Sequence, residues 1–205
     1  MENRITLLAL ALALQVTSAN ANLLTVSPTV DGSALSTTAW TSIDSISDFL
    51  LAQLDSPFPE GRSALEFDIS SIPSGVVIDS ATLNLWGVIS DFNIGVHGYT
   101  GNGTLEAADF ALTNEITQFD PGPVNVVFVT SFIQGRYAAG SQFAGFQLRE
   151  LIDGEITQFA SNEAANAALR PSLIINYSAV PEPSTLVLLS LGLAGLRFSR
   201  RRMLN

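Results

Sequence analysis

The chain has 205 residues, of which 47% are hydrophobic and 14% are charged. This apolar content is sufficient to bury a core, and the low charge argues against a disordered acidic tail. The absence of cysteine excludes a disulfide framework, a thiolate metal site and a cysteine nucleophile.

The charge is unevenly distributed along the chain. Residues 22–183 contain 18 acidic residues against four arginines, which gives this stretch a formal charge of −14. The four are Arg62, Arg136, Arg149 and Arg170. Such a surface repels phosphate backbones, so nucleic-acid binding is not expected, whereas cations and neutral ligands are compatible with it.

The N-terminus has the three parts of a secretory signal peptide. Arg4 supplies the positive region, Ile5–Leu14 is an apolar run, and Ala19-Asn20-Ala21 is a small-residue cleavage site. The alternative is a buried core helix, which does not require this order of parts. We predict a signal peptide over 1–21, cleavage after Ala21, and export by the Sec machinery.

Residues 22–179 predict an all-β domain. Short apolar or alternating runs are separated by Gly, Pro, Asn, Asp and Ser, which is typical of strands and turns. The runs are 22–28, 48–54, 63–69, 81–89, 93–99, 124–129, 143–150 and 172–178. Recurrent short strands of this kind favour a jelly roll or β-sandwich.

The stretch 80–86 alternates with a period of two. Ala81, Leu83 and Leu85 are expected on one face and Trp86 on the other. An exposed aromatic can serve as a stacking platform for a sugar ring, so Trp86 is the predicted glycan contact. The alternative is that its ring covers an edge of the core. Further aromatic candidates are Trp40, Tyr99 and Tyr137.

Helix is expected at two places. Residues 104–112 predict a few turns, and a second helix from Thr130 is expected to be capped by Thr130 or Ser131 and stopped at Gly140. The pentapeptide EITQF occurs at 115–119 and again at 155–159. Its flanks do not align, so we predict two similar strands of one sheet rather than a repeat architecture.

Two stretches of the body resemble the DNRLRE-type jelly-roll domains. "GRSALEFDISSIPSGVVIDSATLNLW" (61–86) is similar to the signature R-x-x-L-x-F-D followed by I-x-x-A-x-L-x-L, and "FASNEAANAALRPSLIINY" (159–177) is similar to the closing stretch of these domains. The resemblance implies a β-sandwich related to carbohydrate-binding modules. Most of the matching positions have a structural explanation. Leu65 and Phe67 would pack inward, Asp68 would cap the next turn, and Arg170 would pair with Glu163.

The sequence offers little catalytic chemistry. The only histidine is His97, and no G-x-S-x-G surrounds a serine, so a serine hydrolase is unsupported. The eighteen acidic residues of 22–183 make some carboxylate pair inevitable, so their number does not indicate a glycosidase. Oxygen ligands leave a Ca²⁺ site open. Its scattered candidate ligands are Asp31, Asp44, Asp48, Asp55 and Asp79. We predict no other cofactor and no enzyme activity.

The C-terminus combines three features. Val180-Pro181-Glu182-Pro183 is an extended, rigid stretch, residues 184–198 are uncharged apart from one arginine near their end, and three more arginines follow. The four arginines are Arg197, Arg200, Arg201 and Arg202. Fifteen helical residues span about 22 Å, less than the roughly 30 Å of a bilayer core. The arginines would hold the far end on the cytoplasmic side.

This order of features resembles the PEP-CTERM sorting signal. Residues 180–183 match its motif, and "LGLAGLRFSRRR" is similar to the segment that usually follows. The resemblance implies processing by an exosortase during transit through the inner membrane. The destination would be the cell surface or extracellular matrix of a bacterium that makes exopolysaccharide. The alternative is an ordinary C-terminal membrane anchor.

The sequence thus predicts an exported β-sandwich domain over 22–179, flanked by a signal peptide (1–21) and a sorting signal with a short transmembrane helix (180–205). The expected role is non-catalytic, with exopolysaccharide as the candidate ligand. The alternatives are a polysaccharide lyase or glycosidase, and a structural matrix protein that self-associates.

Overall fold

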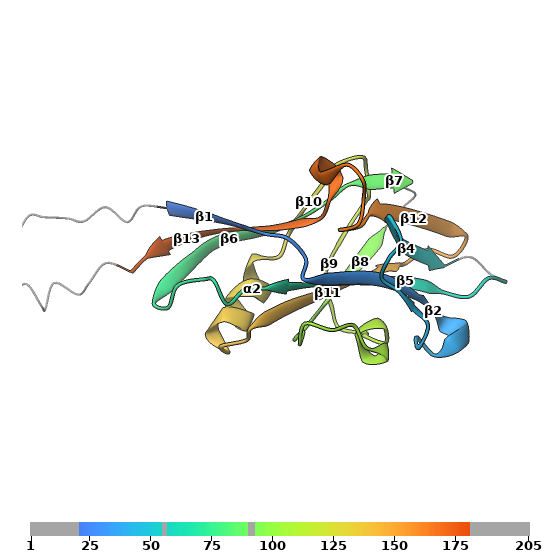
Figure 1. The fold of residues 1–205 in the computed structure, drawn as a ribbon, viewed down its shortest axis with the longest axis horizontal. Helices are drawn as coiled ribbons and strands as arrows, with labels where there is room; N and C mark the ends of the chain where they lie inside the picture. The colour runs from blue at the N-terminus through green and yellow to red at the C-terminus, as the bar shows by residue number, and fades with distance from the viewer. Residues whose placement is uncertain (1–20, 55–56, 90–92, 181–205) are drawn as a thin grey trace, which may run out of the picture. The chain divides into compact units, whose positions relative to one another are not determined.

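The computed structural model describes residues 21–54, 57–89 and 93–180. Within it, Ala21–Ser178 is one compact unit built mainly from strands (Figure 1). The strands are β1 (Ala21–Val26), β2 (Val30–Leu35), β3 (Ile43–Asp44), β4 (Phe49–Leu54), β5 (Gly61–Asp68), β6 (Val76–Leu85), β7 (Gly87–Ile89), β8 (Ile94–Tyr99), β9 (Glu115–Phe119), β10 (Asn125–Phe128), β11 (Phe143–Glu150), β12 (Glu155–Ala160) and β13 (Ser172–Ala179). The helices are α2 (Thr130–Ala138) and the 3₁₀ turns η1 (Ser36–Thr38), η2 (Ala107–Phe110) and η3 (Ala167–Leu169).

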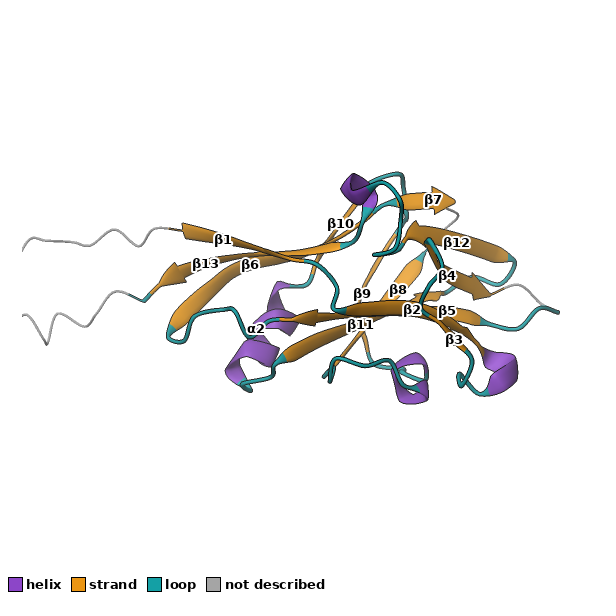
Figure 2. Cartoon of the chain, in the orientation of Figure 1, coloured by secondary structure: helices purple, strands orange, loops and turns teal. Residues whose placement is uncertain are grey.

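The strands form two antiparallel sheets, which confirms the predicted all-β sandwich (Figure 2). The smaller sheet has four strands in the order β1-β13-β6-β10. The larger has nine, in the order β7-β12-β4-β5-β11-β8-β9, with β2 paired to β5 and β3 paired to β2. β13, the last of the described strands, therefore lies between β1 and β6.

The main core fills the space between the sheets. Ala81, Leu83 and Leu85 of β6 are buried as the alternation predicts, and so are Leu65 and Phe67 of β5. The rings of Phe67 and Phe146 meet edge to face with their centroids 5.9 Å apart. Full burial of each such side chain contributes about 1.5–3 kcal/mol, so this core is the main source of stability.

A second, smaller core covers the outer face of β5. Ala34 and Ala64 are buried there together with Phe110, the last residue of η2. Trp40 stacks on Phe110 with ring centroids 6.4 Å apart, and the Arg62 guanidinium lies 4.8 Å from the centroid of the Trp40 ring. Trp40 therefore packs in the fold, whereas the sequence had suggested it as a stacking platform.

The two predicted helices differ in their details from expectation. The first is reduced to the 3₁₀ turn η2, and the second is α2. The N-cap of α2 is Val129, without a side-chain cap, because the Thr130 hydroxyl instead accepts a hydrogen bond from the amide of Ala81 at 3.0 Å. Gly140 follows the helix with φ of +68°, as expected of a stop signal.

The EITQF copies are the strands β9 and β12 of the same sheet, as predicted. They lie at positions far apart in the strand order, yet the rings of Phe119 and Phe159 are only 6.0 Å apart between centroids. The nine-stranded sheet therefore curls strongly, which brings its two end regions together.

Candidate functional sites

The first and last strands of the domain are direct neighbours. β1 runs antiparallel to β13, with Ala21 opposite Ser178 and Val26 opposite Leu173. Leu24 and Val26 pack against the main core, so this pairing is held by burial as well as by the ladder. β1 consequently begins beside the end of β13 (Figure 1).

The two predicted processing sites lie at the adjacent ends of these paired strands. Ala21 is the first residue of β1, and Ala179 is the last residue of β13. Val180 comes next and is about half exposed (51%). Pro181, Glu182, Pro183 and the four arginines lie outside the described residues, as do residues 1–20 of the predicted signal peptide (1–21) and the apolar segment 184–198.

The outer face of β6 and β10 carries a row of apolar side chains. Asn125 pairs with Leu85, and the Gly87 amide donates a hydrogen bond to the Pro123 carbonyl at 3.2 Å, so the ladder continues past β6 and places Val124 opposite Trp86. Val124, Val126 and Phe128 are 61%, 55% and 72% exposed, and Trp86 is half-buried. We call these four residues the apolar strip.

Polar, uncharged groups lie beside the apolar strip. Thr82 is opposite Phe128, and Asn84 is opposite Val126. Farther across the sheet the Asn176 amide donates to the Ser80 hydroxyl at 2.9 Å. Asp79 is the one charged residue in the four strands of this sheet. An apolar, nearly neutral face on so acidic a domain is a candidate binding surface.

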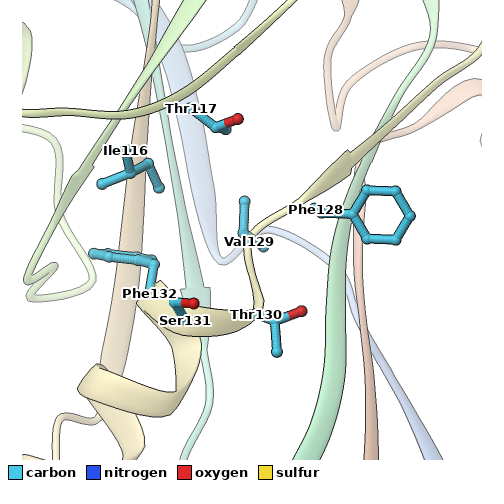
Figure 3. A pocket seen from close by; sticks show the side chains of 7 residues that line it. All are labelled: Ile116, Thr117, Phe128, Val129, Thr130, Ser131 and Phe132. Atoms are coloured by element: carbon cyan, nitrogen blue, oxygen red, sulfur yellow. The ribbon is translucent and has the colours of Figure 1, made fainter.

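A groove of about 410 Å³ lies between β9 and the β10–α2 connection (Figure 3). Ile116, Val129 and Phe132 give it apolar walls, and Thr117 and Ser131 add hydroxyl groups. In Figure 3 the Phe128 ring points away from the other lining side chains. The groove and the apolar strip are therefore separate surfaces that meet at Phe128.

The remaining aromatic candidates are engaged within the fold. Tyr99 is 9% exposed, and burial raises the pKa of its hydroxyl. The Tyr137 hydroxyl donates to the Pro73 carbonyl at 2.8 Å. His97 is 3% exposed, and desolvation lowers the pKa of its imidazole, which keeps the ring neutral.

The candidate calcium ligands that the structure describes form no metal-binding cluster. Asp31 is buried on β2, and its carboxylate accepts a hydrogen bond from the backbone amide of Asn162 at 2.8 Å. Burial, with a contribution from Glu163, raises the pKa of Asp31 to about 7. Asp44 accepts hydrogen bonds from the amides of Ile46 and Ser47. The Asp48 carbonyl accepts a hydrogen bond from the Ser161 backbone amide at 3.0 Å, whereas Asp79 lies on β6 and Asp55 is outside the described residues. The described part of the chain contains no cluster of three or more His, Asp or Glu that could hold a metal ion.

The sequence model of the PEP-CTERM protein-sorting motif matches residues 179–202. The chain ends in a PEP-CTERM sorting signal. The match begins at the last residue of β13 and includes Val180–Pro183 and the arginine cluster through Arg202. A comparison with curated proteins gives no match to the chain.

The sorting signal establishes the route of the protein in outline. It marks an exported protein that is sorted to the cell surface, with an exosortase as its processing partner. In residues 21–54, 57–89 and 93–180, no helix has the length and apolar character that crossing a membrane requires. The predicted transmembrane segment is not among these residues. The resemblance of the body to DNRLRE-type domains stays a prediction.

Proposed function

We propose that the mature domain is a non-catalytic surface or matrix protein that binds exopolysaccharide through the apolar strip. The signal peptide and the tail bring the precursor to the inner membrane, and processing releases the domain to the surface. The observation that carries the binding role is the exposure of Phe128, Val126 and Val124 in one row on a nearly neutral sheet face, with Trp86 opposite Val124 at the far end of the row.

The chemistry of the apolar strip suits a neutral sugar chain. Sugar rings present an apolar C–H face that packs on aromatic and aliphatic side chains, while amide and hydroxyl groups pair with the ring hydroxyls. Phe128 and Trp86 supply the aromatic surface, and Thr82 and Asn84 supply the polar groups. Because the domain is strongly acidic, a neutral polysaccharide is favoured over an anionic one.

The test is titration calorimetry of the processed protein with a panel of soluble bacterial exopolysaccharides. We expect Phe128→Ala to weaken binding about tenfold, which corresponds to loss of one well-packed aromatic contact of roughly 1.4 kcal/mol. Phe58→Ala is the matched control, because Phe58 is similarly exposed (61%) but lies in the turn before β5. Equal affinities for the two variants would refute the assignment to the strip.

Self-association is the second candidate function, and one observation favours it. β10 is an edge strand of its sheet and carries exposed Val126 and Phe128 without a protecting charge. Pairing of two such edges would join the sheets of two molecules. Sedimentation velocity separates the two roles, since a dimer that Phe128→Glu converts to a monomer would support self-association. Measurement of reducing ends and unsaturated uronates in the same mixtures would reveal any enzyme activity.

A further inference from the structure

The end of the four-stranded sheet where β1 begins and β13 ends is one continuous surface. Ala21 lies opposite Ser178, and the Ser178 hydroxyl donates to the Asp79 carboxylate of β6 at 3.2 Å. Leu23 on β1 and Val77 on β6 project from the same outer face and are 65% and 50% exposed. We call Leu23, Val77, Asp79 and Ser178 the sorting end.

The sorting motif follows this surface without a spacer. Ala179 is the last strand residue, and the motif match starts at that residue. Pro183 is four residues further on, so covalent geometry limits it to about 14 Å from Ala179 even in a fully extended chain. A protease that takes residues 181–183 into its cleft must therefore come within that distance of the folded sheet.

The limit of about 14 Å between Ala179 and Pro183 is only slightly more than the spacing of about 10 Å at which two sheets pack in direct contact. An enzyme that binds the motif cannot remain clear of the domain, because its own side chains occupy part of the gap. We propose that the sorting end is a docking surface for the exosortase and that Leu23 and Val77 pack against the rim of its cleft. The proposal rests on the sorting role of the tail and is independent of polysaccharide binding.

The charge distribution favours a protein partner over the lipid surface. The body carries a formal charge of −14, so an anionic membrane surface repels it. The sorting end itself carries exposed aliphatic side chains and only one carboxylate, that of Asp79. Such a surface can pack on an apolar rim at modest desolvation cost.

The test is a pulse–chase measurement of precursor processing in a host that expresses the exosortase. We expect the double substitution Leu23→Glu, Val77→Glu in the full chain to slow processing at least fivefold. The matched control is Val126→Glu, Val124→Glu, because these residues are similarly exposed on the same sheet but belong to the apolar strip. Processing of the sorting-end variant at the normal rate would overturn the proposal.

A spacer provides a second measurement that separates loss of the docking contact from a folding defect of the variant. Six Gly/Ser residues inserted between Ala179 and Val180 extend the reach by about 20 Å, so the domain no longer needs to touch the enzyme. We expect the spacer to restore the rate of the double variant. A variant that stays slow with the spacer would instead have a folding defect, and the docking proposal would lose its support.

The same comparison in detergent distinguishes the enzyme from the bilayer. With solubilised exosortase and full-length precursor, a persistent rate difference places the contact on the enzyme. A difference that appears only in membranes would assign the sorting end to lipid and contradict the proposal. The polysaccharide proposal and the docking proposal fail separately. Apolar-strip variants should lose polysaccharide binding and keep normal processing, and sorting-end variants should show the reverse.

Discussion

Phe119 and Phe159 occupy the same position in two copies of one pentapeptide, and their rings lie 6.0 Å apart between centroids. The contact joins β9 to β12 across the curl of the nine-stranded sheet. Because Phe159 is fully buried and Phe119 only partly, the two copies of the sequence have unequal roles.

Truncation of these rings should reveal that inequality. We expect Phe159→Ala to lower the free energy of unfolding by about 3–5 kcal/mol, and Phe119→Ala to lower it by less. Guanidinium denaturation of the processed domain measures both, and the double variant gives their coupling. An equal or larger loss for Phe119→Ala would contradict the assigned packing.

Two glycines should respond in opposite directions to alanine. A Cβ at Gly145 on β11 would meet the ring of Tyr99, whereas a Cβ at Gly135 in α2 would have nothing within 4 Å. We expect Gly145→Ala to destabilise the domain by about 1–3 kcal/mol, and Gly135→Ala to stabilise it by up to about 1 kcal/mol. Thermal unfolding of the pair checks the signs, and a stabilised Gly145→Ala variant would show that Tyr99 is not packed there.

The buried Asp31 predicts that stability falls as the pH rises. Its pKa is about 7 in the folded domain against about 4 in the unfolded chain. The folded state therefore holds the proton more tightly, so the contribution of Asp31 to stability is full below about pH 4 and is lost as the pH rises to about 7. Burial also raises the pKa values of Glu66 and Asp109, which act in the same direction, whereas hydrogen bonds from Ser70 lower that of Asp68.

Unfolding measured between pH 4 and 8 tests this prediction. We expect Asp31→Asn to flatten the profile in this range, because it removes the titrating group. Glu163→Gln should shift the fall to lower pH, because it removes a negative neighbour of Asp31. A wild-type profile that stays flat or rises between pH 4 and 7 would contradict a raised pKa for Asp31 in the folded domain.

The local features of the fold could be predicted from the sequence. Period-two alternation identified the buried face of β6, and the Asp68 carboxylate accepts a hydrogen bond from the Ser70 amide at 2.8 Å, as its place before a turn suggested. These features depend on neighbours in the chain. The side chain of Arg170 donates to the Ala164 carbonyl at 3.0 Å, where we had predicted an ion pair with Glu163.

The surfaces that depend on strand pairing could not be predicted. Residues 124–129 carry valines on both faces and their one polar residue, Asn125, on the buried face, so the alternation did not reveal that Phe128 points outward. Only the pairing with β6 places it on the same face as Trp86. The packing of Trp40 on Phe110 likewise joins residues 70 positions apart, beyond the reach of a local pattern. The sorting signal could be predicted because its motif, apolar segment and arginine cluster follow one another directly in the sequence.

The mass of the intact protein released from cells that carry an exosortase tests the central claim most directly. We expect the mass of a chain that begins at Asn22 and ends within Val180–Pro183. Such a chain keeps residues 22–26 of β1, which pair with β13. A protein that keeps residues 184–205 and stays in the membrane fraction would make the tail a plain anchor and contradict the account.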